Sequence, residues 1–111
     1  MREIKFRMKD YSGQWYYFGL GNATMTTEET LGQFTGLKDK NGVEIYEGDM
    51  MKHNDYMFVI RFHEGKFGYW YYSEEEKSKF YFVEINCERC KKAEVVGNIH
   101  DNPELLKGGK Q

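Results

Sequence analysis

Residues 33–52, QFTGLKDKNGVEIYEGDMMK, constrain the fold more than any other stretch of the chain. Asn41 and Gly42 lie between two half-apolar runs, and an Asn-Gly pair supplies the positive φ angles of a tight hairpin turn. Apolar and polar side chains alternate after this turn, which is the period of a half-buried strand. Gly48 and Asp49 then mark a second turn before the next strand. The sequence therefore predicts antiparallel strands, with these four residues in structural turns.

The first turn also contains the pattern D-x-N-G, which occurs in calcium-binding EF-hand loops. If Gly42 were the invariant glycine of such a loop, Leu37 would occupy the position of the first carboxylate ligand and Gly48 that of the bidentate glutamate. Neither residue has a side-chain oxygen. The sequence therefore predicts no calcium site at this turn.

Cys87 and Cys90 form a C-x-x-C pair, a pattern of redox sites and of one half of a zinc site. A redox pair needs a helix N-terminus at its first cysteine to lower the thiol pKa, whereas the neighbouring charged residues indicate a polar turn between strands. Zinc needs two further ligands, and only three histidines could supply them: His53, His63 and His100. We expect no metal, no cofactor and no obligatory disulfide, and we expect exchange of both cysteines for serine to leave folding nearly intact.

The composition describes a single folded domain with an aromatic core. The chain has 111 residues, of which 31% are charged and 17% aromatic, and the aromatic content distinguishes it from disordered sequences. Its net charge of -2 gives no overall attraction to nucleic-acid phosphates or anionic membranes. No apolar run reaches the roughly 18 residues of a membrane span, and the first residues do not form a signal peptide. We expect a cytoplasmic domain over residues 1–106 and a flexible tail over residues 107–111.

Period-2 patterns predict the remaining strands. The first, over residues 4–9, is expected at a sheet edge or half exposed. Residues 14–19, aromatic on both faces, are expected in a central strand, with burial favoured over a binding role. Residues 56–62 and 67–72 flank a turn at 64–66 and are expected to pair. Further strands are predicted over residues 80–85 and 93–99, a helical turn over 103–106, and loops over 20–30 and 73–79.

Three blocks of the sequence resemble the YopX family of small proteins encoded by bacteriophages and prophages. They are the opening MREIKFR, the central TGLKDKNGVEIYEGD and the closing VVGNIHDNPELL, in the order of the family. The sequence departs from the family pattern at Lys9, where Trp is frequent, and at Gly32, where an apolar residue is frequent. The resemblance implies a mostly β, SH3-like fold of unassigned molecular function in a bacterial host. We therefore expect a single small antiparallel barrel or a strongly bent sheet, with extensions and a short C-terminal helical turn.

The sequence contains no catalytic fingerprint, and we expect the protein not to be an enzyme. Glu47 and Asp49 flank Gly48 and could form a carboxylate pair. Acceptance of backbone N–H bonds in the turn is the favoured interpretation, because short acidic side chains commonly do this. The two residues would then have a structural role.

Two non-enzymatic functions stay open. The first is protein interaction or self-association, because two Trp, nine Tyr and eight Phe exceed what one small core needs. The competing interpretation is that the loop near residue 20 and the C-terminal turn cover these side chains. The alternative function is nucleic-acid binding by a small β-barrel, in which Lys52 would be a further contact. The predicted interaction surface consists of Trp70, Tyr72, Arg61 and Lys66.

Overall fold

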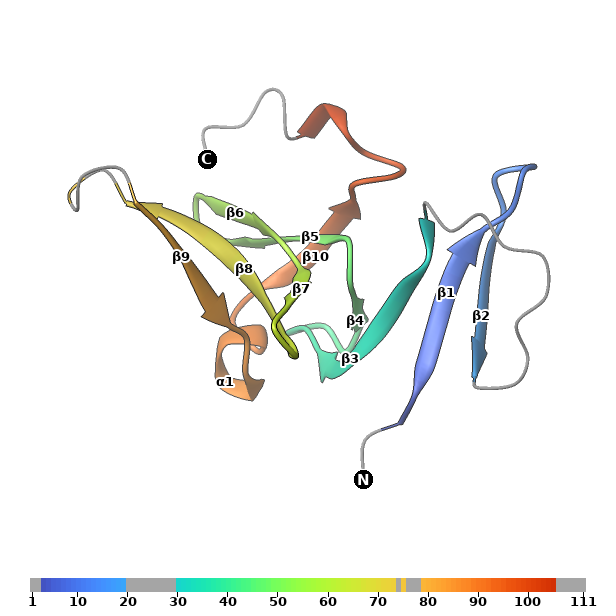
Figure 1. Ribbon diagram of the computed structural model, residues 1–111, viewed down its shortest axis with the longest axis horizontal. Coiled ribbons are helices and arrows are strands. Elements are labelled where there is room, and N and C mark those ends of the chain that lie inside the picture. Colours follow the sequence, from blue (N-terminus) through green and yellow to red (C-terminus); the bar gives the residue numbers. More distant parts are fainter. Residues whose placement is uncertain (1–2, 20–29, 74, 76–78, 106–111) are drawn as a thin grey trace.

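The computed structural model describes residues 3–19, 30–73, 75 and 79–105. These residues form ten strands in three antiparallel sheets and one single-turn helix, α1 (Cys87–Cys90) (Figure 1). The mostly β, antiparallel fold predicted from the alternating sequence pattern is confirmed. Helical structure is limited to short turns in the part of the chain that the structure describes.

The first sheet contains four strands. In spatial order they are β2 (Trp15–Gly19), β1 (Lys5–Lys9), β3 (Gly32–Lys38) and β4 (Glu44–Tyr46). β1 and β2 pair along their whole length, whereas β1 meets β3 at only two positions, Phe6 with Gln33 and Arg7 with Gly32. The β1–β2 hairpin therefore lies at one side of the molecule, on the right in Figure 1.

The other two sheets have three strands each. They are β10 (Glu94–Asn98), β5 (Asp49–His53) and β6 (Tyr56–Val59), and then β7 (Arg61–His63), β8 (Lys66–Ser73) and β9 (Lys79–Glu84). The single strand predicted over 56–62 is broken at Ile60. The Ile60 N–H donates to the Asp49 carbonyl at 2.9 Å, and the Ile60 carbonyl accepts from the Gly48 N–H at 2.8 Å. As a result β6 pairs with β5, and only β7 pairs with β8.

This break separates two of the three sheets, and no closed barrel is found among the described residues. A barrel needs one continuous ladder of hydrogen-bonded strands, and the strands described here belong to three separate ladders. The general expectation of antiparallel β structure is correct, and the SH3-like barrel that the family resemblance implies is not confirmed.

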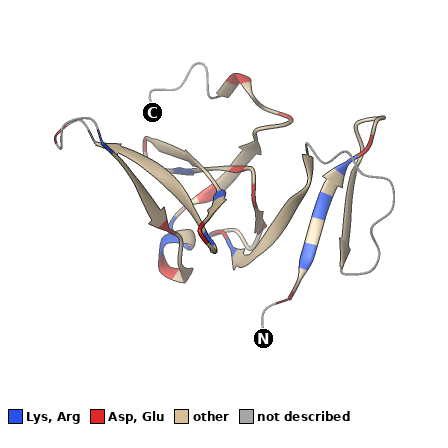
Figure 2. Cartoon of the chain, viewed as in Figure 1, with Lys and Arg blue, Asp and Glu red and all other residues tan. Residues whose placement is uncertain are grey.

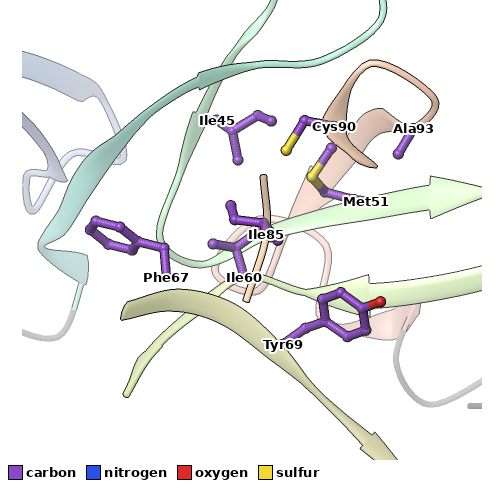
Figure 3. Close-up of a cluster of buried hydrophobic side chains, with 8 residues drawn as sticks. All are labelled: Ile45, Met51, Ile60, Phe67, Tyr69, Ile85, Cys90 and Ala93. Atoms are coloured by element: carbon purple, nitrogen blue, oxygen red, sulfur yellow. The ribbon is translucent and has the colours of Figure 1, made fainter. Parts of the chain in front are cut away.

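One hydrophobic core joins the three sheets (Figure 3). Its eight buried members come from β4, β5, β8, α1 and the links between strands: Ile45, Met51, Ile60, Phe67, Tyr69, Ile85, Cys90 and Ala93. Half-buried side chains of β3, β6, β9 and β10 pack against this cluster. Burying one large apolar side chain contributes about 1.5–3 kcal/mol, so each member is a sizeable fraction of the net stability of a domain.

Three of the four predicted turn residues, Asn41, Gly42 and Gly48, lie in two turns of the chain, and the fourth, Asp49, is the first residue of β5. At the first turn, one Asp39 oxygen accepts from the N–H groups of Asn41 and Val43 at 2.8 and 2.9 Å. The other Asp39 oxygen accepts from the Val95 N–H at 2.8 Å, which ties the turn to β10. The glycines in the two turns, Gly42 and Gly48, have φ angles of +82° and +95°. These left-handed conformations favour glycine because a Cβ atom is strained there.

The two N-terminal strands differ from the prediction. β2, which its aromatic pattern places in the centre of a sheet, is an edge strand, and Tyr16 and Tyr17 are exposed. β1, predicted at an edge or half exposed, is not at an edge: it lies between β2 and β3, with Arg7 and Met8 buried and its other three residues partly exposed. Alternation gives the two faces of a strand but not its neighbours, because the neighbours are distant in the sequence.

The C-terminal third contains a further difference. The segment between β9 and β10, predicted as a polar turn, forms α1, because the Asn86 side chain caps it by accepting from the Arg89 N–H at 2.9 Å. Residues 104–105 are helical, as predicted for part of the C-terminal turn. Most of the two predicted loops and all of the tail at 107–111 lie outside the described residues. No helix in the described ranges has the length and apolar character needed to cross a membrane.

Candidate functional site

The outward face of the sheet formed by β7, β8 and β9 carries most of the predicted interaction surface. Opposite residues of antiparallel strands point to the same face, and the pairs here are Arg61 with Gly68, His63 with Lys66, Trp70 with Phe82, and Tyr72 with Phe80. We call Trp70, Tyr72, Phe80 and Phe82 the outer aromatic face. Arg61 and Lys66 lie on the same side of the sheet.

Three rings of the outer aromatic face are exposed: Trp70 by 45%, Tyr72 by 40% and Phe80 by 63%. They are held in place by one another, because Trp70 packs edge-to-face on Phe82 with ring centroids 5.1 Å apart, and Tyr72 lies 4.9 Å from Phe80. Edge-to-face packing of this kind adds about 0.5–1.5 kcal/mol per pair. The exposed rings therefore have defined positions on a rigid sheet.

Gly68 allows Phe82 to lie over the strand. A Cβ atom at Gly68 would be 2.2 Å from the Val83 carbonyl oxygen and 2.9 Å from the Phe82 ring, which is closer than such contacts occur. On the opposite face of the same sheet, Phe67 and Tyr69 enter the core. The inner face of β8 is thus buried at Phe67 and Tyr69, whereas Tyr71 farther along the same face is 43% exposed, about as much as Trp70 on the outer face.

A cavity of about 340 Å³ lies where β6 approaches β8. Its walls come from both strands, from β7 and from β9: Tyr56, Met57, Phe58, Val59, Arg61, Trp70, Tyr72 and Phe80. Arg61 is the only charged residue in this wall. The cavity thus brings together three of the four residues of the predicted surface, although they come from two strands of the sequence.

Lys66, the fourth predicted residue, is not part of this cavity. It lies on the same face at the turn end of β8 and lines a different cavity of about 560 Å³, which it shares with Glu84 and other charged side chains. The predicted surface is therefore divided between an apolar cavity and a charged one.

Arg61 forms no ion pair with any residue that the structure describes. Its charge acts on Glu47 and on His100. Partial burial raises the pKa of Glu47, and the hydrogen bond with the Gln33 backbone and the Arg61 charge act in the opposite direction. Glu47 and Asp49 do not form a carboxylate pair, because both Asp49 oxygens are bonded to other groups, one to Arg7 and one to the Tyr46 N–H. The carboxylate pair considered from the sequence is thus separated.

A second cluster, which sequence reasoning missed, surrounds Arg7 in β1. Arg7 is 6% exposed and Asp49 2% exposed, and the Arg7 Nη2 lies 2.7 Å from the Asp49 Oδ1. The guanidinium lies between two rings, 4.8 Å from the centroid of Trp15 and 4.9 Å from that of Tyr46. The other Asp49 oxygen accepts from the Tyr46 N–H at 2.8 Å. Burial raises the pKa of Asp49, although the neighbouring Arg7 charge acts to lower it.

The cluster extends along β1 to the C-terminal segment. Lys9 and the Trp15 Nε1 both bond to Asp101, the latter at 2.8 Å, and the Lys5 Nζ bonds to Glu44 at 2.7 Å. Figure 2 shows the three basic residues alternating along β1. Because each cation has a carboxylate partner on another element, this cluster fastens the β1–β2 hairpin to the rest of the molecule.

The chain matches the model of the family described as YopX protein over residues 3–107. It belongs to the YopX family. A solved structure with a similar sequence is that of protein EF1440 from Enterococcus faecalis, which is 29% identical, with 93% of this chain and 78% of that chain covered and a TM-score of 0.44. No curated protein matches the chain.

In this YopX-family chain, the candidate metal ligands do not come together. His63 packs on Trp70 with ring centroids 4.8 Å apart, whereas His100 packs on Trp15 with ring centroids 5.9 Å apart. Cys87 is exposed and Cys90 is buried, both as free thiols. Among the described residues no group of three or more His, Cys, Asp or Glu side chains is placed to hold a metal ion.

The sequence contained a signal for the Arg7 cluster. Lys5, Arg7 and Lys9 alternate with apolar residues, so three cations share one face of β1. Three like charges on one strand face are unfavourable unless carboxylates neutralise them. The pattern therefore indicates acidic partners, but their identity depends on residues about 40 to 90 positions away.

Proposed function

We propose that this YopX-family chain is a non-enzymatic protein-interaction or self-associating module, and that the outer aromatic face is its contact surface. The observation that carries the proposal is the exposure of Trp70, Tyr72 and Phe80 together on one face of a sheet. Contiguous exposed apolar patches of this kind mark interaction sites. Tyr and Trp suit such sites because they offer a large contact area at a small cost in side-chain entropy.

A buried charged pair supports the non-enzymatic part of the proposal. Arg7 and Asp49 form an ion pair with each other, so the two charges neutralise one another and hold β1 beside β5. On the outer face of this sheet the basic groups are Arg61 and Lys66, and His63 packs against Trp70. The proposal includes a cytoplasmic location in a bacterial host that carries a phage or prophage, which the family resemblance implies.

Nucleic-acid binding is the second candidate, because Arg61 and Lys66 share a face with the aromatic rings. Single-stranded nucleic acids bind to surfaces where bases stack on aromatic rings between basic groups. Two features favour protein instead. The rings pack edge-to-face on one another, which occupies part of their stacking surface, and the net charge is -2.

The test compares two pairs of exposed aromatic residues. Trp70→Ser with Tyr72→Ser removes two rings of the outer aromatic face, and Tyr16→Ser with Tyr17→Ser removes two rings of β2 that are at least as exposed, as a control. Association is measured by sedimentation velocity over a range of concentrations, and by capture of partners from phage-infected cells after nuclease treatment. We expect the first variant alone to lose association while its melting temperature stays close to that of the wild type.

Three results would contradict the proposal. One is a monomer that captures no nuclease-resistant partner at any concentration. The second is equal loss of association in both variants. The third is binding to single-stranded DNA at low salt that disappears at moderate salt and depends on Arg61 and Lys66, which would establish the nucleic-acid alternative.

A further inference from the structure

The cavity between β6 and β8 lies between two strand edges. β6 is the last strand of its sheet, because the spatial order is β10, β5, β6. On the facing side, β7 covers β8 only as far as Gly68, its partner being Arg61. In the described part of the chain no strand pairs with the outer edge of β6, or with the β7-facing edge of β8 at Trp70 and Tyr72. Both edges therefore offer backbone groups next to the cavity.

The walls of the cavity are preformed. Tyr56 and Phe58 stack on each other with centroids 5.9 Å apart, and Phe58 packs 4.2 Å from the core residue Tyr69. The opposite wall consists of Trp70, Tyr72 and Phe80, which the preceding ring contacts hold in place. A volume of about 340 Å³ is at the lower end of the range for ligand sites. It has room for one bulky side chain rather than for a folded surface.

The positive charge of Arg61 in the cavity wall also restricts which chemical groups can bind there. Arg61 is exposed, is the only charged group in the lining, and has no ion pair with a described residue. A guanidinium binds carboxylates through two parallel hydrogen bonds, and this bond is stronger beside apolar walls than in open water. An apolar occupant with a neighbouring carboxylate would satisfy both parts of the site.

We propose that this cavity binds an extended peptide segment of a partner protein, with a bulky apolar side chain in the cavity and a nearby carboxylate on Arg61. An extended segment can also bond to the strand edge, which is a general mode of peptide recognition. In such a segment side chains two positions apart point to the same side. The recognised pattern is therefore an aromatic or large aliphatic residue followed or preceded, two positions away, by Asp or Glu. This inference rests on the proposed interaction function and specifies the partner.

The inference is tested with fluorescently labelled, N-acetylated eight-residue peptides and the full-length protein. The probe peptide has Phe and Glu two positions apart in a Ser/Thr background, in both orders. One matched peptide has Gln in place of Glu, and another has Ser in place of Phe. Binding is followed by fluorescence anisotropy. We expect the best probe to bind at least tenfold more tightly than either matched peptide, and tighter binding at low than at high salt.

Protein variants then assign the contacts. Arg61→Gln is expected to weaken binding of the Glu peptide at least tenfold and to leave binding of the Gln peptide unchanged. Lys66→Gln is the control, because Lys66 has the same charge on the same face but lies outside this cavity. Trp70→Ala is expected to weaken binding of the two Phe-containing peptides by the same factor and to leave the Ser-for-Phe peptide unchanged, because only Phe enters the cavity that Trp70 lines. Circular dichroism shows whether each variant is folded.

The inference is overturned if no peptide binds at millimolar concentration, if Arg61→Gln and Lys66→Gln have equal effects, or if the Glu and Gln peptides bind equally. It is also overturned if a second copy of the chain competes for the cavity and binds more tightly than every peptide. Loss of partner capture in the Trp70→Ser, Tyr72→Ser variant, together with no peptide binding, would remove this inference while the proposed function stands. If the Trp70→Ser, Tyr72→Ser variant still captures the partner and no peptide binds, both this inference and the proposed function are wrong.

Discussion

The two sides of the molecule are held in place by different forces. On the β1–β2 side, three basic residues of β1 bind carboxylates of distant elements: Lys5 to Glu44, Arg7 to Asp49 and Lys9 to Asp101. On the β8–β9 side, no ion pair of the described residues joins these strands to another element, and the sheet is attached through apolar residues such as Phe67 and Tyr69.

This difference separates the strands that are fixed by ion pairs from the strands that present a candidate binding surface. An ion pair fixes two groups at a defined geometry, so it specifies where a hairpin with few ladder contacts must lie. Apolar attachment through one face of a sheet needs no partner on the other face. The β8–β9 side can therefore present aromatic rings to solvent, whereas the aromatic rings of Trp15 and Tyr46 on the other side are used to cover Arg7.

The largest expected effect comes from breaking the charged attachment. Asp49→Ala leaves the Arg7 charge buried without its partner, which should lower the free energy of unfolding by about 3–5 kcal/mol. The measurement is urea denaturation followed by circular dichroism. Glu94→Ala is the control, because Glu94 pairs with Lys40 and both side chains are largely exposed. That change should cost less than about 1 kcal/mol. Equal costs would show that burial of the Arg7 pair is unimportant.

The apolar attachment is broken at Cys90. This side chain lies in the core, so Cys90→Ser should cost about 1–3 kcal/mol, because a hydroxyl group is buried without water. Cys87 is exposed, and Cys87→Ser should change the stability by less than about 0.5 kcal/mol. The structure thus changes the sequence-based expectation that both exchanges are harmless.

The reactivity of the two thiols is a second test of the difference between the buried Cys90 and the exposed Cys87. Burial raises the pKa of Cys90 to about 11, so at pH 8 iodoacetamide should label Cys87 and reach Cys90 only after unfolding. Rapid labelling of both cysteines in the folded protein would show that α1 does not cover the core.

Substitution of the two turn glycines distinguishes the cost of backbone strain from the cost of added contacts with neighbouring side chains. Gly42→Val places a side chain in open space at positive φ, since nothing lies within 4 Å of the added Cβ. Gly48→Val adds the same strain near His100 and Arg7, whose atoms lie 3.7 and 3.9 Å from the added Cβ. Both should destabilise by about 1–3 kcal/mol, with Gly42 at the lower end. Thermal melting of both variants decides the order, and a larger loss for Gly42→Val would contradict it.

The smallest effect is a pH dependence on the charged side. Bonds from Lys9 and Trp15 lower the pKa of Asp101 from 3.8 to about 2. The ionised carboxylate is thus favoured in the folded state, so its contribution is complete above pH 3.8 and is lost as the pH falls through 2. Asp101→Asn should therefore lose less stability between pH 4 and 2 than the wild type does. The measurement is urea denaturation of both proteins across this pH range. If both lose the same stability between pH 4 and 2, Asp101 is not bound in the folded state.

The parts of the fold that depend on local chemistry could be predicted from the sequence. The turn at Asn41 and Gly42 needs positive φ angles, and the sequence supplies residues that adopt them. The strand at 80–85 and the one at 93–99 follow from alternation. The break at Ile60 could not be predicted, because an isoleucine has no local tendency to end a strand. It arises from hydrogen bonds to Gly48 and Asp49.

The candidate site was predictable to a similar extent. Alternation along β8 places Trp70 and Tyr72 on the same face, and the short turn before β8 brings Arg61 to that face. The sequence could not show that β6 forms the second wall of a cavity, because β6 belongs to a different sheet. It also could not identify Arg7 as buried, since an arginine is ordinarily placed on the solvent side of a strand.

The bonds of Lys9 and Trp15 to Asp101 have a consequence for synthesis of the chain. They span 92 and 86 positions, and a ribosome adds about 5–20 residues per second. The β1–β2 hairpin, complete at Gly19, is therefore synthesised about 4–16 s before Asp101 is added. Until then the bonds from Lys9 and Trp15 to Asp101 cannot form, so the nascent hairpin gains from a chaperone that covers it.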